Sequence, residues 1–304
     1  MREVETELIP VQEALERFRG EIQETHSVSF QIMEIGGIHP DKGNEPFFDP
    51  YTQQESTEDF SNIGKHCIAV GYCADKIAEK LLEKKALTPE DFHTIVARAL
   101  VHDVMRRLVA CERRTKQSFE EWEIHNEDDV ALHELFENFS EEDAPGKDMI
   151  NYLGVAGRET GHMSLKEFVT LDPEGKPILK PDKTLVDIIV HVADDMTASP
   201  KPGVSEETKF VAIEERMRLG NFPERHPHLF RSGFGFDADN HPVLVDDVHD
   251  QLVIQGLKQV KSYKEWQILV FTFCTDRLSN IIDPHSSSSS REHIKKIVNS
   301  GLLT

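Results

Sequence analysis

Cysteine is scarce in this chain, and the few cysteines present are not arranged as in disulfide frameworks or structural zinc sites. The 304 residues include Cys67, Cys73, Cys111 and Cys274, and no two of these are separated by just two residues. Small secreted domains that are stabilised by disulfides carry cysteine at much higher density. We therefore expect reduced thiols and a cytoplasmic location.

Long apolar segments are lacking as well. A membrane-spanning helix needs about 20 consecutive, mostly apolar residues, and no segment approaches this length. The first ten residues, MREVETELIP, include three glutamates and are followed by no apolar stretch, so they do not resemble a secretory signal. The sequence therefore predicts a protein without a membrane partner.

Basic residues are in the minority. Lysine and arginine number 34 against 55 aspartates and glutamates, which gives a formal net charge of −21. Nucleic-acid polymers and anionic membranes are bound by clustered lysine and arginine that release counterions, so we expect neither as a partner. A small, nucleotide-like phosphorylated substrate is still compatible with this net charge if a local cluster of cations makes the potential at its binding site positive.

The chain does have the composition of a folded domain and an abundance of histidine. Hydrophobic residues make up 38% and charged residues 29%, so a chain of this length can bury a sizeable core. Fifteen residues are histidine, which is the commonest metal ligand and the usual acid–base group near neutral pH. The histidines on apolar helix faces are therefore the candidates for a functional site.

Two neighbouring segments have the pattern of core-facing helices. Apolar residues recur at spacings of three and four over 62–84, and His66 lies at the edge of that stripe. Thr88 and Pro89, followed by two acids, are typical of a helix start. A second apolar stripe runs from there over 92–99.

The second stripe continues through polar residues, which is the most informative feature of the sequence. His102, Asp103 and Arg106 stand where aliphatic residues would be expected. An unpaired buried carboxylate costs several kcal/mol, so Asp103 needs a cation, a hydrogen-bond network or a metal. Either Arg106 or Arg107 could provide a cation for a phosphate, and Arg106, which stays on the inner stripe, is favoured; the alternative is that both are solvated residues on the helix exterior.

Most of the other segments also have helical patterning. Residues 184–197 are apolar nearly all round, which indicates a central buried helix, and this helix ends in Asp194 and Asp195. Short surface hairpins are predicted at 171–180 and 236–245. Further helices are expected at 8–25, 119–139, 145–168, near 205–219 and from about 248 to 280.

The order of the candidate residues resembles a known signature. His66, then His102-Asp103, then an Ala-Asp pair at 193–194 is similar to the H…HD…D pattern of the HD-domain metal-dependent phosphohydrolase superfamily. HCIAVGYCADKIAEKLL resembles the first motif helix of that family, and VARALVHDVMRR resembles its apolar run ending in HD. The similarity covers residues 60–203 and implies a helical bundle.

Within that superfamily the sequence looks nearest to the HD-GYP branch of cyclic-dinucleotide phosphodiesterases. VADDMTASPKP is similar to the branch's pattern around the last aspartate, and His125 and His162 fall in suitable order for further ligands. The chain departs from that branch at three places. No Gly-Tyr-Pro follows His162, Gly161 stands where a second histidine occurs, and Met105-Arg106 replaces Gly-Lys.

The resemblance implies a metal centre and a chemistry. His66, His102, Asp103 and Asp194 would form the basic metal site, and His125 and His162 would extend it to a second ion. Imidazole and carboxylate ligands favour iron or manganese, with magnesium, nickel, cobalt or zinc as alternatives. Asp103 and Arg106 are the catalytic candidates, Asp103 beside the metal that activates water and Arg106 as a cation for the substrate phosphate.

Several alternatives stay open from the residues alone. Helical phasing favours Asp195 over Asp194, and His133 lies two turns after His125 on the same side. His191 is expected to be a core residue near the aspartate pair.

The sequence as a whole therefore predicts a mostly α-helical protein with an HD-type domain. We expect an N-terminal helix and loop at 1–59, the metal-binding domain at 60–203, a helical extension at 204–285, and a serine-rich linker with a terminal helix at 286–304. The predicted function is a metal-dependent phosphohydrolase or phosphodiesterase that cleaves a phosphate ester of a nucleotide or cyclic dinucleotide. The alternative is a degenerate HD scaffold that senses a nucleotide or contacts a protein, and a homodimer is compatible with either.

Overall fold

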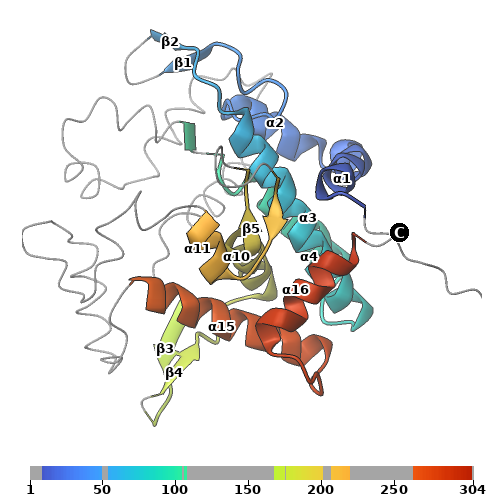
Figure 1. Cartoon of the computed structure of the whole chain (residues 1–304), viewed down its shortest axis with the longest axis vertical. Helices are drawn as coiled ribbons and strands as arrows, with labels where there is room; N and C mark the ends of the chain where they lie inside the picture. The colour runs from blue at the N-terminus through green and yellow to red at the C-terminus, as the bar shows by residue number, and fades with distance from the viewer. Residues whose placement is uncertain are drawn as a thin grey trace, which may run out of the picture. The chain divides into compact units, whose positions relative to one another are not determined.

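Helices make up most of the described part of the chain in the computed structural model (Figure 1). The structure describes residues 9–49, 54–104, 106–107, 168–174, 176–200, 207–219 and 263–302. The helices within these residues are α1 (Val11–Thr25), α2 (Ser27–Ile35), α3 (Ser61–Glu83), α4 (Pro89–Val101), α10 (Leu185–Met196), α11 (Ile213–Leu219), α15 (Tyr263–Ile282) and α16 (Ser290–Ser300). The prediction of a mostly α-helical protein is confirmed.

The described strands are short and form three antiparallel pairs. They are β1 (Phe47–Asp49) with β2 (Gln54–Ser56), β3 (Val169–Leu171) with β4 (Pro177–Leu179), and β5 (Thr197–Ala198) with β6 (Lys209–Phe210). In the β3–β4 hairpin Val169 pairs with Leu179 and Leu171 with Pro177, which confirms the hairpin predicted near 171–180.

The chain divides into two compact units that interleave along the sequence. Unit 1 consists of Met1–Arg17, Tyr72–Ile95 and Met163–Thr304, and unit 2 consists of Phe18–Gly71 and Val96–His162. The segment boundaries expected at 59/60, 203/204 and 285/286 stay predictions.

In unit 2 the first part of α3 lies close to the last part of α4. A Cβ atom at Gly71 of α3 would lie 2.9 Å from the Leu100 side chain of α4, so the absence of a side chain at Gly71 permits this approach. Farther toward the N-terminus of α3, a Cβ atom at Gly64 would lie 2.1 Å from the Ile38 carbonyl oxygen. These two close approaches fix the stretch of α3 that carries His66.

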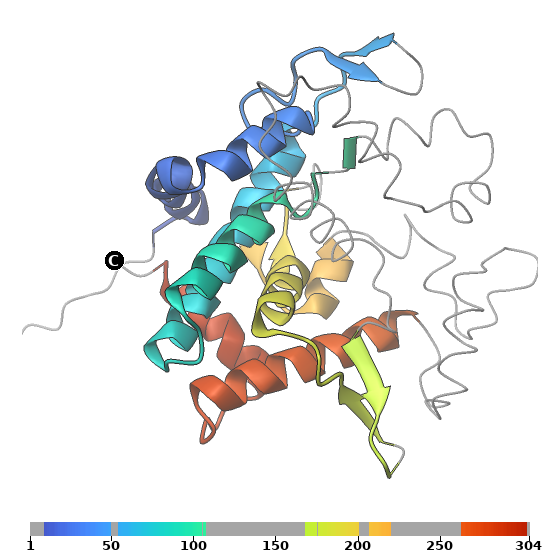
Figure 2. The same cartoon turned by 180° about the vertical axis from the view of Figure 1, so that it is seen from behind.

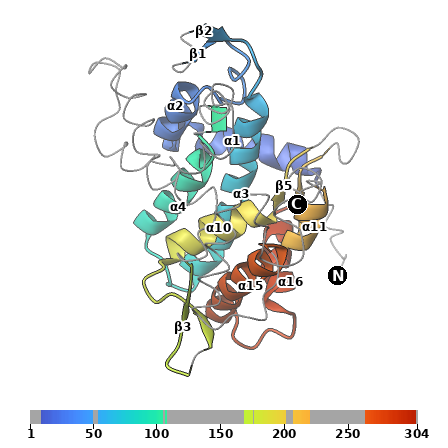
Figure 3. The same ribbon diagram turned by 90° about the vertical axis from the view of Figure 1, so that its left-hand side faces the viewer.

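In unit 1 the helix α10 is held between α11 and α15, and α15 also contacts α16 (Figures 2 and 3). A capping box starts α10, since the Thr184 hydroxyl accepts the Asp187 amide while the Asp187 carboxylate accepts the Thr184 amide. The buried hydrophobic residues of this unit include Ile188, Ile189 and Val192 of α10 and Phe271, Cys274 and Leu278 of α15. The central buried helix that the sequence predicts at 184–197 is therefore present.

Two helix predictions were wrong in extent. The second stripe was expected to continue as helix through Arg106, but α4 ends at Val101 and His102–Val104 form a turn. The helix expected near 205–219 begins only at Ile213, because Lys209 and Phe210 pair as β6 with β5. The α2 helix and the β1–β2 hairpin had no counterpart in the sequence-based expectations.

The described cysteines Cys67, Cys73 and Cys274 are buried free thiols, and burial raises the pKa of both Cys73 and Cys274 above the usual value. No helix in the described ranges is both long and apolar enough to cross a membrane. Cys111, the helices expected at 119–139 and 145–168, and the hairpin expected at 236–245 lie outside the described residues.

Candidate metal centre

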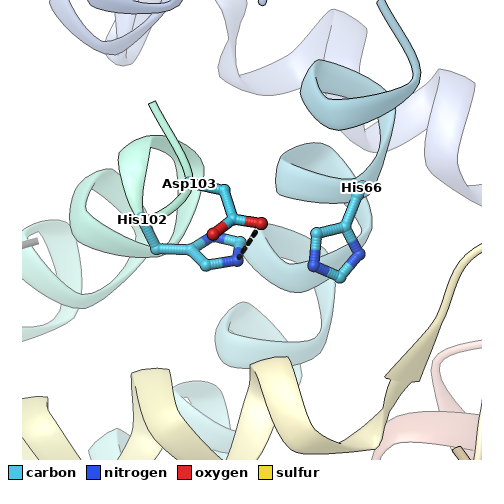
Figure 4. A group of neighbouring side chains, drawn as sticks. All are labelled: His66, His102 and Asp103. Atoms are coloured by element: carbon cyan, nitrogen blue, oxygen red, sulfur yellow. Dashed lines mark ion pairs between the residues drawn. The ribbon is translucent and has the colours of Figure 1, made fainter. Parts of the chain in front are cut away.

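Two histidines and an aspartate of unit 2 converge on one point (Figure 4). One ligand atom from each of His66, His102 and Asp103 lies within 4.8 Å of the others, and the group could hold a metal ion. His66 comes from α3, while His102 and Asp103 follow the end of α4. The close packing of α3 and α4 at Gly71 and Leu100 therefore brings together residues that are far apart in the sequence.

The two imidazoles meet edge to face. The ring centroids of His66 and His102 are 5.2 Å apart, and the ring planes are inclined by 62°. His66 is half-buried, whereas His102 is only 1% exposed. The group is therefore shielded from solvent at His102 and accessible to solvent at His66.

The backbone fixes the orientation of the His102 ring. The Nδ1 atom of His102 lies 2.7 Å from the Ala99 carbonyl oxygen. Because a carbonyl can only accept, this contact places the ring proton on Nδ1 and leaves the Nε2 lone pair as the ligand atom. A backbone carbonyl that orients a histidine in this way is a common support of metal-ligating imidazoles.

This contact lies in the last turn of α4, which ends at Val101. The turn at His102–Val104 that follows directs both motif residues toward α3.

The Asp103 carboxylate lies between a histidine and an arginine. Its Oδ2 atom is 3.9 Å from His102 Nε2, and its Oδ1 atom accepts a hydrogen bond from Arg106 Nε at 2.8 Å. Asp103 is buried, whereas the Arg106 side chain is 41% exposed. Asp103 thus has the cationic partner that a buried carboxylate requires.

The structure differs from the expectations for the two consecutive arginines. Arg106 was expected on the inner stripe, but its side chain is 41% exposed, whereas Arg107 is only 1% exposed and does not lie on the helix exterior. The expectation assumed that the helical periodicity of the 92–99 stripe continues to Arg106. The turn at His102–Val104 interrupts the helix, so this periodicity does not hold for the residues after it. Arg106 still reaches the site, because it folds back onto the carboxylate of Asp103.

The aspartate pair at the end of α10 belongs to unit 1. Arg216 of α11 donates to Asp194 Oδ1 at 2.7 Å and to Asp195 Oδ1 at 3.1 Å. Asp195 is 3% exposed, as phasing predicted, and its Oδ2 atom is 3.4 Å from Nε2 of the buried His191. Burial raises the pKa of Asp195, although His191 and Arg216 oppose that shift.

The two aspartates differ in their exposure to solvent. The Asp194 side chain is 21% exposed against 5% for that of Asp195. Nothing in the sequence indicates the role of Arg216, because its pairing with acids 21 and 22 residues earlier depends on the packing of α11 against α10. His191 is a core residue, as expected, and its ring stacks on Phe168 with centroids 4.6 Å apart.

His125, its alternative His133, and His162 lie outside the described residues. Their roles, and that of Asp194 as a fourth ligand, stay predictions. In comparisons with known proteins, no family model matches the chain, and no curated protein or solved structure matches it significantly.

The chemistry of the donor set suits a divalent first-row metal. Two imidazole nitrogens and one carboxylate oxygen are the ligands that iron, manganese, nickel, cobalt and zinc accept, and the group contains no thiolate. Three protein ligands also leave coordination positions for water or substrate, as catalytic sites require.

Proposed function

We propose that the protein is an HD-type metal-dependent phosphohydrolase whose metal centre includes His66, His102 and Asp103. The observation that supports this most directly is the convergence of these three side chains within 4.8 Å. They are the H and HD residues of the resemblance, and His66 lies within ligand distance of the other two although it precedes them by 36 and 37 positions in the sequence.

The three ligands have distinct tasks in this proposal. His102 binds through Nε2, because its Nδ1 proton is held by the Ala99 carbonyl. Asp103 contributes a negative charge and binds next to His102. When bound, a divalent ion supplies a nucleophile at neutral pH and neutralises negative charge on a phosphate ester.

Arg106 is the proposed contact for the substrate phosphate. Its Nε atom donates to Asp103 Oδ1 at 2.8 Å, and its side chain is 41% exposed. A guanidinium has five donors in a fixed plane, and it matches the geometry of phosphate oxygens. A cation here favours an anionic substrate despite the net charge of −21, and we propose a nucleotide or cyclic dinucleotide.

Metal content and turnover test this proposal together. The untagged full-length chain would be loaded with Mn²⁺ or Fe²⁺, and metal per chain would be measured for the parent, His66→Ala and Asp103→Asn. His93→Ala is the matched control, because His93 is an exposed histidine on α4. Turnover would be followed with bis-p-nitrophenyl phosphate, p-nitrophenyl phosphate, nucleoside monophosphates and cyclic dinucleotides.

We expect metal uptake and phosphate-ester hydrolysis by the parent and the His93 control, and loss of both in the two site variants. Asp194→Asn and Asp195→Asn, measured beside them, identify which aspartate is a further ligand. Metal uptake with no turnover of any substrate would instead favour the degenerate sensing scaffold. A parent that takes up no metal overturns the proposal.

A further inference from the structure

Arg107 is one of the most deeply buried side chains of unit 2, and its guanidinium is surrounded by main-chain carbonyl groups. Its Nη1 atom donates to the carbonyl oxygens of Gly37 at 2.8 Å and Gly43 at 3.2 Å. Its Nη2 atom donates to those of Ser56 at 3.1 Å and Glu45 at 3.4 Å. The side chain is 1% exposed.

An aromatic ring completes these surroundings. The Cζ atom of Arg107 lies 5.2 Å from the centroid of the Phe60 ring, a distance at which a cation is attracted to the ring face. The four carbonyls and the ring together, which we call the carbonyl cage, match a planar cation with several donors. A lysine ammonium has three donors at one point and cannot reach four carbonyls on two sides.

The cage joins two parts of unit 2 that matter for the candidate metal centre. Ser56 is the last residue of β2, Glu45 lies two residues before β1, and Gly37 and Gly43 lie in the loop that leads to the hairpin. Arg107 follows Asp103 by four residues, directly after the turn that carries both motif residues. The guanidinium therefore anchors the C-terminal side of that turn to the loop.

The N-terminal side of the turn is anchored separately. Helix α4 holds it through the contact of the His102 ring with Ala99 and the close approach of Leu100 to Gly71. A turn that is fixed at both ends presents its side chains in one arrangement.

We propose that Arg107 is a positioning residue of the metal centre, and that its binding in the carbonyl cage sets the geometry of Asp103 for metal binding. This inference rests on the proposed metal-binding function. It assigns the two consecutive arginines different tasks: Arg106 contacts the site, and Arg107 holds the backbone that carries it.

Cobalt binding by the full-length chain tests the proposal without any assay of activity. Co²⁺ affinity and the visible absorption of the Co²⁺ complex would be measured for the parent, Arg107→Lys and Arg107→Ala. Arg277→Ala is the matched control, because Arg277 is a part-buried arginine of unit 1 that also donates to a backbone carbonyl, that of Lys183 at 3.1 Å. Far-ultraviolet circular dichroism of each protein reports whether it folds.

We expect both Arg107 variants to fold, to bind Co²⁺ about tenfold more weakly than the parent, as loss of a residue that supports metal ligands commonly causes, and to give a changed absorption band. The Arg277 variant should bind as the parent does. Because Arg107→Ala leaves the cage empty, millimolar guanidinium chloride should restore its Co²⁺ affinity, whereas sodium chloride at the same concentration should not.

Three results would overturn the positioning role. Parental affinity and spectrum in both folded variants would show that Arg107 does not act on the metal centre. Weak binding that guanidinium does not restore, or failure of even Arg107→Lys to fold, would assign the arginine to general stability. A parent that binds no Co²⁺ is a distinct outcome, because it overturns the proposed function and this inference with it.

Discussion

Gly64 shows how closely single residues are fitted around the candidate metal centre. It lies in α3, two residues before His66. A Cβ atom there would lie 2.1 Å from the Ile38 carbonyl oxygen and 2.8 Å from the Pro40 nitrogen. Because both are backbone atoms, a side chain at Gly64 can be accommodated only if the loop or the helix moves.

Gly64→Ala is therefore expected to be destabilising. The clash should lower the apparent free energy of unfolding by about 1–3 kcal/mol, the usual cost of overpacking a well-packed region. The shift of α3 should also weaken metal binding through His66. Urea denaturation with and without Co²⁺ measures both effects.

Gly20 is the matched control at the residue scale. It is exposed in the middle of α1, and a Cβ atom there would meet nothing within 4 Å. Alanine lowers the entropy of the unfolded chain and favours the helix, so Gly20→Ala should stabilise by about 0.5–1 kcal/mol. If the two variants changed stability in the same direction, the steric account of Gly64 would be wrong.

The candidate site was predictable from sequence at some residues and not at others. His66, His102 and Asp103 could be identified because polar residues interrupt apolar stripes and because their order resembles a known signature. The carbonyl cage of Arg107 could not, since its acceptors are main-chain atoms at positions 37, 43, 45 and 56. Every residue has a backbone carbonyl, so the residue types do not indicate which carbonyls converge. Their convergence depends on the tertiary fold.

At the scale of single elements, the start of α4 is set by a capping box. The Thr88 hydroxyl accepts the Asp91 amide at 3.1 Å, and Asp91 Oδ2 accepts from both the Thr88 amide at 2.9 Å and the Thr88 hydroxyl at 2.7 Å. These hydrogen bonds to the backbone and side chain of Thr88 lower the pKa of Asp91 below its usual value. The box also fixes the residue at which α4 begins, and α4 ends at the candidate site.

Asp91→Ala should lower the stability of the protein by about 1 kcal/mol at neutral pH, as loss of a helix cap typically does. A carboxylate with a lowered folded-state pKa contributes its full stabilisation above its unfolded pKa and loses it as the pH falls through the folded pKa. The difference in melting temperature between parent and variant should thus be constant from about pH 7 to 5 and shrink below about pH 4.

Glu90→Ala is the control for this measurement, because Glu90 lies in the same first turn of α4 but does not take part in the box. Its effect on the melting temperature should be smaller than that of Asp91→Ala. A difference for Asp91→Ala that stays constant down to about pH 3 would contradict the proposed ionic cap.

Periodic elements were easier to predict than short irregular ones. Helices α3, α4 and α10 have apolar stripes and start signals that local physical chemistry explains. The bounds of α3 and α10 lie close to the expected ones, and α4 begins where expected but ends earlier, at Val101. The β1–β2 hairpin lies in a segment rich in glycine and proline that indicated only a loop. The pairing of β5 with β6 joins residues 197–198 with 209–210, and two-residue strands carry too little periodicity to be recognised.

At the scale of the whole molecule, charge of one sign dominates. A net charge of −21 on 304 residues repels itself in the compact state. Added salt shortens the Debye length from about 30 Å at 0.01 M to about 10 Å at 0.1 M, and this weakens the repulsion. The melting temperature should therefore rise when sodium chloride is increased over this range.

Choline chloride is the control, because it screens charge without offering a small cation that could bind specifically. A rise of similar size in both salts supports general screening. A melting temperature that falls with salt would mean that ion pairs such as Arg216 with Asp194 contribute more to stability than the excess negative charge takes away.

The interleaving of the two units also bears on the order in which the nascent chain can fold. Unit 2 ends at His162, whereas unit 1 takes most of its residues from Met163–Thr304. All of unit 2 is therefore synthesised while α10, α11, α15 and α16 are still missing. Because domains fold as units during synthesis, N-terminal parts first, His66, His102 and Asp103 can come together before the ribosome has made the helices that complete unit 1.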